Sequence, residues 1–464
     1  MLFQTPQFFV FLGVVLILFY SAPQRWRKFI LLAASYYFYM SWIPVFILLL
    51  LALTAIDYCA ARWIAQTGSL RQRKTALVVS LSANLGLLGF FKYYNFFAEN
   101  IAHVLGQPSN AFALSIILPL GISFHTFQSM SYVIDVYRKE QEPIRNPIDY
   151  ALFIPFFPQL VAGPIVRARE FFRDLYAWRR PSTAEASQGI LLVLLGLAKK
   201  TIMADQFAQI ANAYFQDVGK HPGMLSAWSG TIAFGIQIYF DFSGYTDMAI
   251  GMAKLLGFHF PVNFRRPYLA SSITDFWHRW HMSLSRWLRD YLYIPLGGNR
   301  GGTLKTYRNL MLTMLLGGLW HGANWNFIVW GGYHGALLSI ERTFRGGKPE
   351  DDRWTALYPV QAVATFALAM AGWVFFRAAT FRESLYVLGQ MLTGSKGEML
   401  IPAWLLSLAL LTLVLAVIEE KKAWFERIAV GPAWAYGAAC ALLLLSVELI
   451  GFTGPAVPFV YFQF

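Results

Sequence analysis

The sequence predicts an all-α, polytopic membrane protein with roughly ten to twelve transmembrane helices and further re-entrant or interfacial helices. Of its 464 residues, 57% are hydrophobic and only 14% are charged, whereas about 25% of the residues in a soluble domain are charged. Uncharged stretches long enough to cross a bilayer as a helix recur along the chain, and the basic residues lie mostly between them. These observations argue against a water-soluble fold.

Residues 8–20 form the first apolar segment, and basic residues follow it instead of preceding it: Arg25, Arg27 and Lys28. A cleaved signal peptide has the opposite order, so we expect a retained transmembrane helix. The positive-inside rule then places these basic residues in the cytoplasm and the N-terminus outside.

The next apolar stretch, residues 29–56, contains Pro44, which is expected to divide it into two helices. Two helices return the chain to the side from which it left. The basic residues from Arg62 to Lys74 are therefore predicted on the same cytoplasmic side. Further uncharged spans cover residues 75–91, 354–376, 401–418 and 428–447.

No clear repeat, low-complexity tract or linker divides the chain, so we expect one membrane domain, residues 1–464, that includes an aromatic tail at residues 455–464. The net charge of +13 does not indicate nucleic-acid binding, because basic loops orient membrane proteins and contact anionic lipids. The two cysteines, Cys59 and Cys440, lie in apolar runs without metal-ligand spacing. We expect both in the core, and we expect neither a metal nor a bound cofactor.

Two segments are too polar to face lipid. Residues 237–247 place Asp241 and Asp247 among aromatic side chains, and buried carboxylates need partners or protons. Residues 272–300 alternate aromatic with charged side chains, which predicts an interfacial or re-entrant helix with tryptophans at headgroup depth. This segment leads into PLGGNRGG, a Gly-rich turn that could offer N–H groups and Arg300 to a phosphorylated ligand.

Two histidines lie in residues 309–340, a run that contains no Asp, Glu, Lys or Arg. Polar groups without partners are costly in hydrocarbon, so ionisable residues within a membrane are functional candidates. The plainer alternative is a histidine that packs between helices and bonds to a neighbouring carbonyl. For His321, flanked by tryptophan and glycine, the local sequence supports both interpretations equally, whereas helix packing or support of the site explains His334 at least as well as catalysis does.

Two adjoining motifs read DFWHRWHMSLSRWLRDYLYIPLGGNRGG and RNLMLTMLLGGLWHGANWNFIVWGGYHG, and LPLGISFHTFQSMSYVIDVYR, FFPQLVAGPIVR and QIYFDFSGYTDMAIG precede them. Together they resemble the membrane-bound O-acyltransferase superfamily, specifically its bacterial branch that acts in alginate O-acetylation. The resemblance covers most of the chain. It implies a multipass protein of the bacterial inner membrane that moves an acyl group from a cytoplasmic thioester to a hydroxyl on an extracytoplasmic acceptor.

The resemblance also implies a donor, an acceptor and partners. Acetyl-CoA is the expected donor, with an acyl carrier protein as the alternative, and the acceptor is an exported cell-surface polysaccharide such as alginate or cellulose. The expected partners are a periplasmic SGNH or esterase-like acetyltransferase and the machinery that synthesises and exports the polysaccharide. A lipid or protein O-acyltransferase is one alternative, and a proton-coupled transporter is another, although the sequence shows no paired halves.

The resemblance assigns roles to individual residues. His321, in the WHG context, is the base that accepts the hydroxyl proton and returns it to the leaving thiolate. His281 is the second residue of the site. Donor binding or support of the site is expected from Asp275, Arg279, Arg289, Asp290, Asn299, Asn324 and His334.

The end of the sequence, FVYFQF, follows Pro455 and Pro458 and cannot simply continue the preceding helix. A terminal aromatic cluster is ordinarily an interfacial anchor. This one resembles an aromatic-Tyr motif associated with acyl relay in cell-envelope acylation. We therefore expect Tyr461 to accept the acyl group before passing it to a partner.

Overall fold

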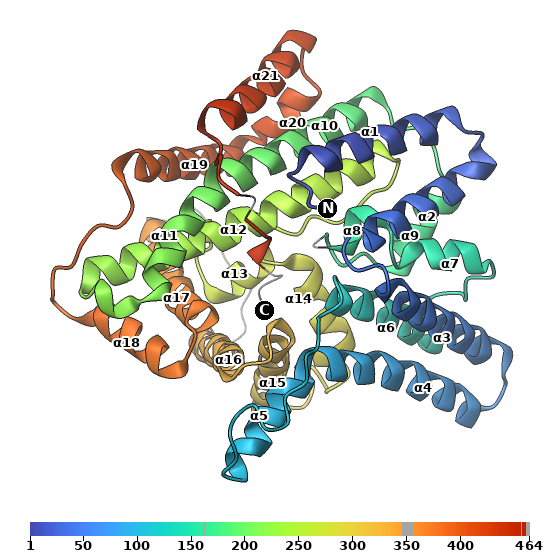
Figure 1. Ribbon diagram of the computed structural model, residues 1–464, viewed down its shortest axis with the longest axis horizontal. Helices are drawn as coiled ribbons and strands as arrows, with labels where there is room; N and C mark the ends of the chain where they lie inside the picture. The colour runs from blue at the N-terminus through green and yellow to red at the C-terminus, as the bar shows by residue number, and fades with distance from the viewer. Residues whose placement is uncertain (162, 346–355, 456, 461–464) are drawn as a thin grey trace. The chain divides into compact units, whose positions relative to one another are not determined.

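Every regular element in the described part of the chain is a helix (Figure 1), which confirms the predicted all-α fold. The computed structural model describes residues 1–161, 163–345, 356–455 and 457–460. The chain divides into two compact units: Met1–Ser182 with Ala249–Pro261, and Thr183–Met248 with Val262–Phe464.

The helices of the first unit reproduce the spans predicted near the start of the chain. Residues 8–20 lie in α1 (Pro6–Ser21). Pro44 lies between α2 (Gln24–Met40) and α3 (Phe46–Gln66), so the predicted division into two helices is confirmed. The remaining elements are α4 (Leu70–Leu88), the π-helical η1 (Gly89–Tyr93), α5 (Tyr94–Val104), α6 (Ile122–Arg138), α7 (Pro147–Phe153), α8 (Phe157–Leu160) and α9 (Ala168–Tyr176).

The second unit contains most of the remaining helices. Helix α12 supplies residues to both units. The elements are α10 (Thr183–Ala198), η2 (Lys199–Ala204), α11 (Asp205–Gln216), η3 (Val218–Lys220), α12 (Met224–Leu255), η4 (Pro267–Leu269), α13 (Ile273–Arg279), α14 (Met282–Leu288), η5 (Arg289–Tyr293), α15 (Thr303–His321), α16 (Trp325–Arg345), α17 (Tyr358–Arg377), α18 (Phe381–Leu392), α19 (Ala403–Lys422), α20 (Trp424–Ala429) and α21 (Ala433–Ile450).

Five helical segments among the described residues are long and apolar enough to cross a membrane: Phe46–Gln66, Leu70–Val104, Tyr358–Arg377, Ala403–Lys422 and Ala433–Ile450. In the last two, only 6% and 0% of the most apolar window is buried inside the protein. Apolar helices that expose nearly their whole surface are stable in lipid and not in water. The protein is therefore a multipass membrane protein, and the total of ten to twelve spans stays a prediction.

The expectation that both cysteines lie in the core is wrong. Cys59 on α3 is exposed and Cys440 on α21 is partly exposed. A helix that crosses a membrane is apolar on the side that faces lipid as well as on the side that faces the protein. An apolar sequence context therefore does not show on which side a cysteine lies.

The segment from residue 272 to residue 300 also differs from its prediction. It forms three short helical pieces, α13, α14 and the π-helical η5, instead of one continuous interfacial or re-entrant helix. Trp280 and Trp287 are 1% and 7% exposed, so their rings pack inside the protein, and their depth in the membrane stays a prediction. Trp280 packs on Trp373 with ring centroids 4.8 Å apart. This part of the chain therefore contributes to an aromatic core.

Candidate functional site

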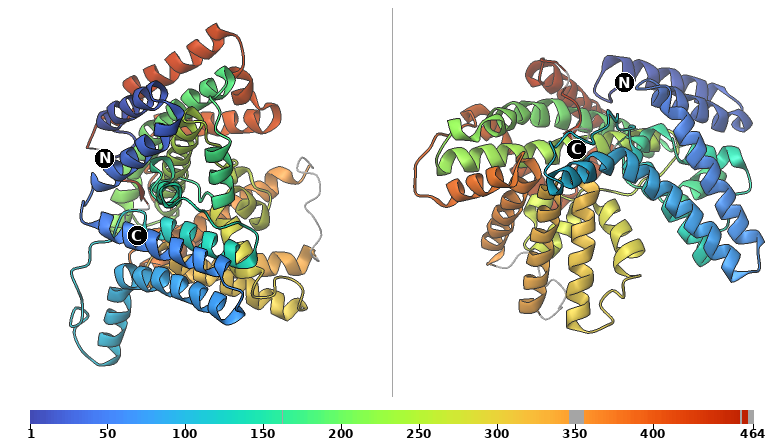
Figure 2. Two further views of the ribbon diagram at one scale, coloured as in Figure 1. Left: turned by 90° about the vertical axis from the view of Figure 1, so that its right-hand side faces the viewer. Right: turned by 60° about the horizontal axis from the view of Figure 1, so that its bottom comes forward.

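His321 is the last residue of α15, and the close packing of α15 against α16 fixes its position. The two helices lie side by side in every view (Figures 1 and 2). A Cβ atom at Gly318 would overlap the carbonyl oxygen of Phe327, and one at Gly331 would overlap that of Met314. The glycines thus allow the helix backbones to touch, and the chain turns directly after His321.

The imidazole of His321 is enclosed by aromatic rings. Trp330 of α16 and Phe376 of α17 pack edge-on against it, with centroid distances of 5.1 and 5.4 Å. The neighbouring Trp320 lies 5.0 Å away and is itself buried. Since His321 is only 4% exposed, the site excludes most water.

His281 has an unusual backbone conformation for a residue with a side chain. It precedes α14 with φ 44° and ψ 52°, in the left-handed region, and it is fully buried. Non-glycine residues held there cost about 1–3 kcal/mol and persist where the surrounding structure fixes them, often at functional sites. His281 is therefore held in place by its neighbours.

Asn263 is the neighbour that orients the His281 side chain. Its Oδ1 accepts hydrogen bonds from the backbone N–H and the hydroxyl of Ser283, at 3.1 and 2.9 Å, and it lies 3.2 Å from His281 Nδ1. Because a backbone N–H can only donate, the Asn263 atom is the oxygen, and His281 Nδ1 must carry the proton. The neutral His281 ring then has its lone pair on Nε2.

The structure brings the two predicted histidines together. The ring centroids of His281 and His321 are 6.5 Å apart, with an angle of 60° between the planes. Two rings this close together can both contact one reacting group that lies beside them. The arrangement supplies two imidazoles in a buried site, which suits proton transfer to and from a substrate.

His334 is surrounded by aromatic rings, one of which also contacts His321. Trp330 contacts both histidines, with its ring 5.1 Å from each of theirs. His334 is fully buried and stacks on Phe276 at 6.1 Å. Neither of its ring nitrogens has a hydrogen-bond partner among the described residues. This placement fits support of the Trp330 ring rather than contact with substrate.

Asp275 and Arg279 form an ion pair inside the second unit. Arg279 Nε lies 2.7 Å from Asp275, and Arg279 Nη1 lies 3.1 Å from Glu420 at the end of α19. Both members of the first pair are buried. They tie α13 to α19, so the structure gives them a role in packing.

The four other predicted residues lie outside the histidine site. Arg289 and Asp290 form a pair on η5, 2.7 Å apart, with the arginine largely exposed. Asn299 is exposed. Asn324 is exposed, and its Oδ1 accepts the Asn326 N–H at the start of α16, at 2.9 Å. Arg289, Asn299 and Asn324 are therefore part of the surface, whereas Asp290 is partly buried.

The Gly-rich turn between η5 and α15 has a defined conformation. Gly297, Gly298 and Gly302 have φ of 112°, 54° and 86°, which residues with a Cβ atom rarely adopt. Asn309 of α15 fixes the turn by donating from Nδ2 to the Gly298 carbonyl at 3.0 Å. Arg300 is exposed on it.

Tyr461 lies outside the described residues. The described chain reaches Val460, whose N–H donates to Asp241 at 2.6 Å. Within the described residues, no three His, Cys, Asp or Glu side chains form a group that could hold a metal ion.

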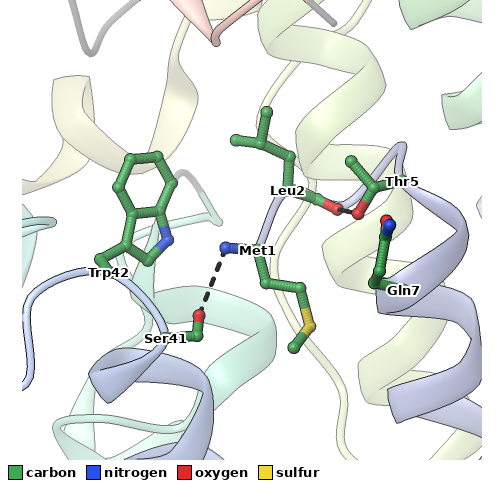
Figure 3. Close-up of a pocket in the computed structure, with 6 residues that line it drawn as sticks. All are labelled: Met1, Leu2, Thr5, Gln7, Ser41 and Trp42. Carbon is green, nitrogen blue, oxygen red and sulfur yellow. Dashed lines mark hydrogen bonds between the residues drawn. The ribbon is translucent and has the colours of Figure 1, made fainter.

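A surface hollow of about 550 Å³ lies in the first unit (Figure 3). The N-terminal ammonium donates to the Ser41 hydroxyl across it, at 3.3 Å. Its lining contains no histidine and no acidic side chain: Met1, Leu2, Thr5, Gln7, Ser41 and Trp42. It offers no proton-transfer group comparable to the histidine pair.

The sequence is similar to known acyltransferases. The sequence model of the membrane-bound O-acyltransferase family matches residues 32–376. The probable alginate O-acetylase AlgI of Azotobacter vinelandii is 43% identical over 424 residues, 90% of this chain and 84% of the relative. The peptidoglycan O-acetyltransferase of Helicobacter pylori is 38% identical over 424 residues, 84% and 80% of the two chains. The teichoic acid D-alanyltransferase of Bacillus subtilis is 31% identical over 285 residues, 57% and 70%.

Proposed function

The chain belongs to the membrane-bound O-acyltransferase family, and from this premise we propose that it transfers acetyl groups from a cytoplasmic thioester for the O-acetylation of an exported polysaccharide. The observation that carries the proposal is the buried pair of His281 and His321. The similarity to an alginate O-acetylase and to a peptidoglycan O-acetyltransferase supports a glycan as the final acceptor.

The chemistry needs one proton to move in and out of the site. As the acceptor oxygen attacks the thioester carbonyl, His321 accepts the hydroxyl proton. The tetrahedral intermediate then collapses, the carbon–sulfur bond breaks, and His321 returns the proton to the thiolate. A thioester and an alcohol become an ester and a thiol, with no net change in protons.

His281 has a separate role in this proposal. Its Nδ1–H is held by Asn263, so its Nε2 lone pair has a fixed direction. We assign to this nitrogen a hydrogen bond that orients the incoming substrate beside His321. The left-handed backbone at His281 keeps that direction constant, which lowers the cost of aligning the reactants.

We propose that the acyl donor binds at the Gly-rich turn. Acetyl-CoA carries phosphate groups, and an exposed turn with backbone N–H groups and an arginine can bind them. Arg300 on the turn supplies the positive charge, and the exposed Arg289 on η5, although paired with Asp290, is a second candidate. An acyl carrier protein would bring phosphate on its prosthetic group to the same surface.

The acyl group then needs a route to the acceptor. We propose that the phenol oxygen of Tyr461 attacks the thioester while His321 takes its proton, and that the tyrosyl ester passes the acetyl group to a hydroxyl on a periplasmic SGNH or esterase-like partner. The test is acetyl capture on the purified protein from labelled acetyl-CoA. Capture that is lost in Tyr461→Phe supports the relay, and capture that persists excludes Tyr461 from it.

The proposed acceptor is tested in the host. Deletion of the gene should remove O-acetyl groups from the secreted polysaccharide, and the unchanged gene or His278→Ala should restore them, because His278 is exposed. His321→Ala should not restore them. Normal polysaccharide acetylation in the deletion strain, with loss of an acylated lipid or protein instead, would favour the other members of the superfamily.

A further inference from the structure

The strongest unexplained feature of the second unit is a buried lysine between two aspartates. Lys200 Nζ lies 2.7 Å from Asp205 and 2.9 Å from Asp241. All three side chains are buried. Lys200 lies on the π-helical η2, a type of helical turn that is often found at functional sites.

Three ionised groups in the interior are expensive unless each has partners. One ammonium group cannot neutralise two ionised carboxylates, so a further hydrogen-bond donor to Asp241 is favourable. The second oxygen of Asp241 has no cation partner among the described residues. It accepts the backbone N–H of Val460, at 2.6 Å, which is 219 residues away in sequence.

The segment that follows α21 runs along this cluster. The N–H of Phe452 donates to the carbonyl oxygen of Thr201 on η2, at 3.0 Å. Further along, the ring of Phe459 packs between Tyr245 at 4.6 Å and Phe242 at 5.5 Å. Phe459 and Val460 are both buried, so the segment enters the interior.

The place where Phe459 and Val460 enter the interior is close to the histidine pair. The ring of Phe242, next to Asp241 on α12, lies 4.7 Å from the ring of His281 and 5.5 Å from the ring of Phe459. One aromatic ring thus contacts both the end of the described segment and His281. Tyr461 is the next residue in the sequence.

We propose that Asp241, held by Lys200 and Asp205, is an internal docking site for the peptide backbone of residues 457–460. Asp241 acts as a positioning residue: its carboxylate anchors the Val460 N–H and so sets the point from which the chain continues to Tyr461. The value of this position for acyl transfer rests on the proposed relay, whereas the docking itself does not.

The charges explain why a carboxylate is suited to this task. A carboxylate accepts an N–H hydrogen bond more strongly than a neutral amide oxygen does. Lys200 and Asp205 would remain a neutral pair after removal of Asp241, so an Asp241 variant leaves no unpaired charge. Such a variant should therefore keep the fold and release the segment.

The test measures exposure of residue 460 directly. In a Cys59→Ser, Cys440→Ser background, Val460→Cys keeps the backbone N–H and provides a thiol in a buried position. We expect labelling by N-ethylmaleimide in detergent to be about tenfold faster when Asp241→Leu is added, with an intermediate rate for Asp241→Asn. Asp217→Asn, which removes an exposed carboxylate near Lys220, is the matched control and should leave the rate unchanged. Equal rates in all of these proteins would overturn the docking site.

A second pair of variants leaves the charged cluster intact. Val460→Pro removes the N–H that Asp241 binds, whereas Val460→Ala retains it. We expect acetyl capture to fall about tenfold in the proline variant only. If Asp241→Leu speeds labelling while Tyr461→Phe leaves acetyl capture intact, the docking holds and the relay fails. If Tyr461→Phe abolishes capture while labelling and both Val460 variants behave as the parent protein, the relay holds and the docking fails.

Discussion

Asn263 shows how one polar side chain can organise the site. Its Oδ1 faces Ser283 and His281, which lie 20 and 18 residues later in the sequence. Removing a buried acceptor leaves its donors without partners, and each such donor costs about 1–3 kcal/mol. The imidazole of His281 would also lose its fixed tautomer.

We therefore predict that Asn263→Ala lowers kcat for acyl transfer about 10- to 100-fold and leaves KM for the thioester nearly unchanged. Asn263→Asp retains an acceptor oxygen and should recover part of the lost rate. Steady-state kinetics with purified protein measure both values. An alanine variant in which only KM rises would show that Asn263 serves substrate binding and not the alignment of His281.

At the residue scale, the sequence predicted both histidines of the site but not the residue that orients His281. His321 stands out because a histidine in an uncharged apolar run needs a reason. The pairing with His281 depended on resemblance, since no local pattern brings residues forty positions apart together. Asn263 was missed. The only signal was a lone amide in the largely apolar stretch PVNF, and its partners become visible only when the chain folds.

The hairpin of α15 and α16 depends on two glycines at its contact. A methyl group at Gly318 or Gly331 would meet a backbone carbonyl that cannot rotate away. Forcing extra atoms into a packed interface typically costs about 1–3 kcal/mol.

Gly318→Ala and Gly331→Ala should each lower the free energy of unfolding by about that amount and should displace His321. Gly437 on α21 has open space around its Cβ position, so Gly437→Ala is the matched control and should be neutral or slightly stabilising. Denaturant unfolding in detergent measures the three variants. Equal stability of the two contact variants and the control would contradict the tight hairpin.

At the element scale, helices were predictable where a local rule governs them. Pro44 marks the break between α2 and α3, and the uncharged runs mark α17, α19 and α21. The segment from 272 to 300 was not predictable in detail. Alternating aromatic and charged residues fit a membrane interface and also a buried core with internal ion pairs, and only the tertiary partners of Trp280 and Arg279 distinguish the two.

For the whole molecule, the lipid environment follows from exposed apolar helices, and the orientation stays a prediction of the positive-inside rule. Single cysteines in the Cys59→Ser, Cys440→Ser background can test it. Ser69→Cys, in the exposed loop between α3 and α4, should be protected from an impermeant maleimide on intact cells. Ser41→Cys, between α2 and α3, should be labelled. The reverse pattern would invert the proposed topology.

His321 is proposed as the base of an acyl transfer in the membrane. The direct measurement is thioester consumption and acetyl transfer by the purified protein with labelled acetyl-CoA, compared between the unchanged protein, His321→Ala and the exposed control His278→Ala. A lost general base lowers the rate about 10²- to 10⁴-fold, so we predict a loss in that range for His321→Ala and none for His278→Ala. Unchanged turnover in a folded His321→Ala protein would contradict the account.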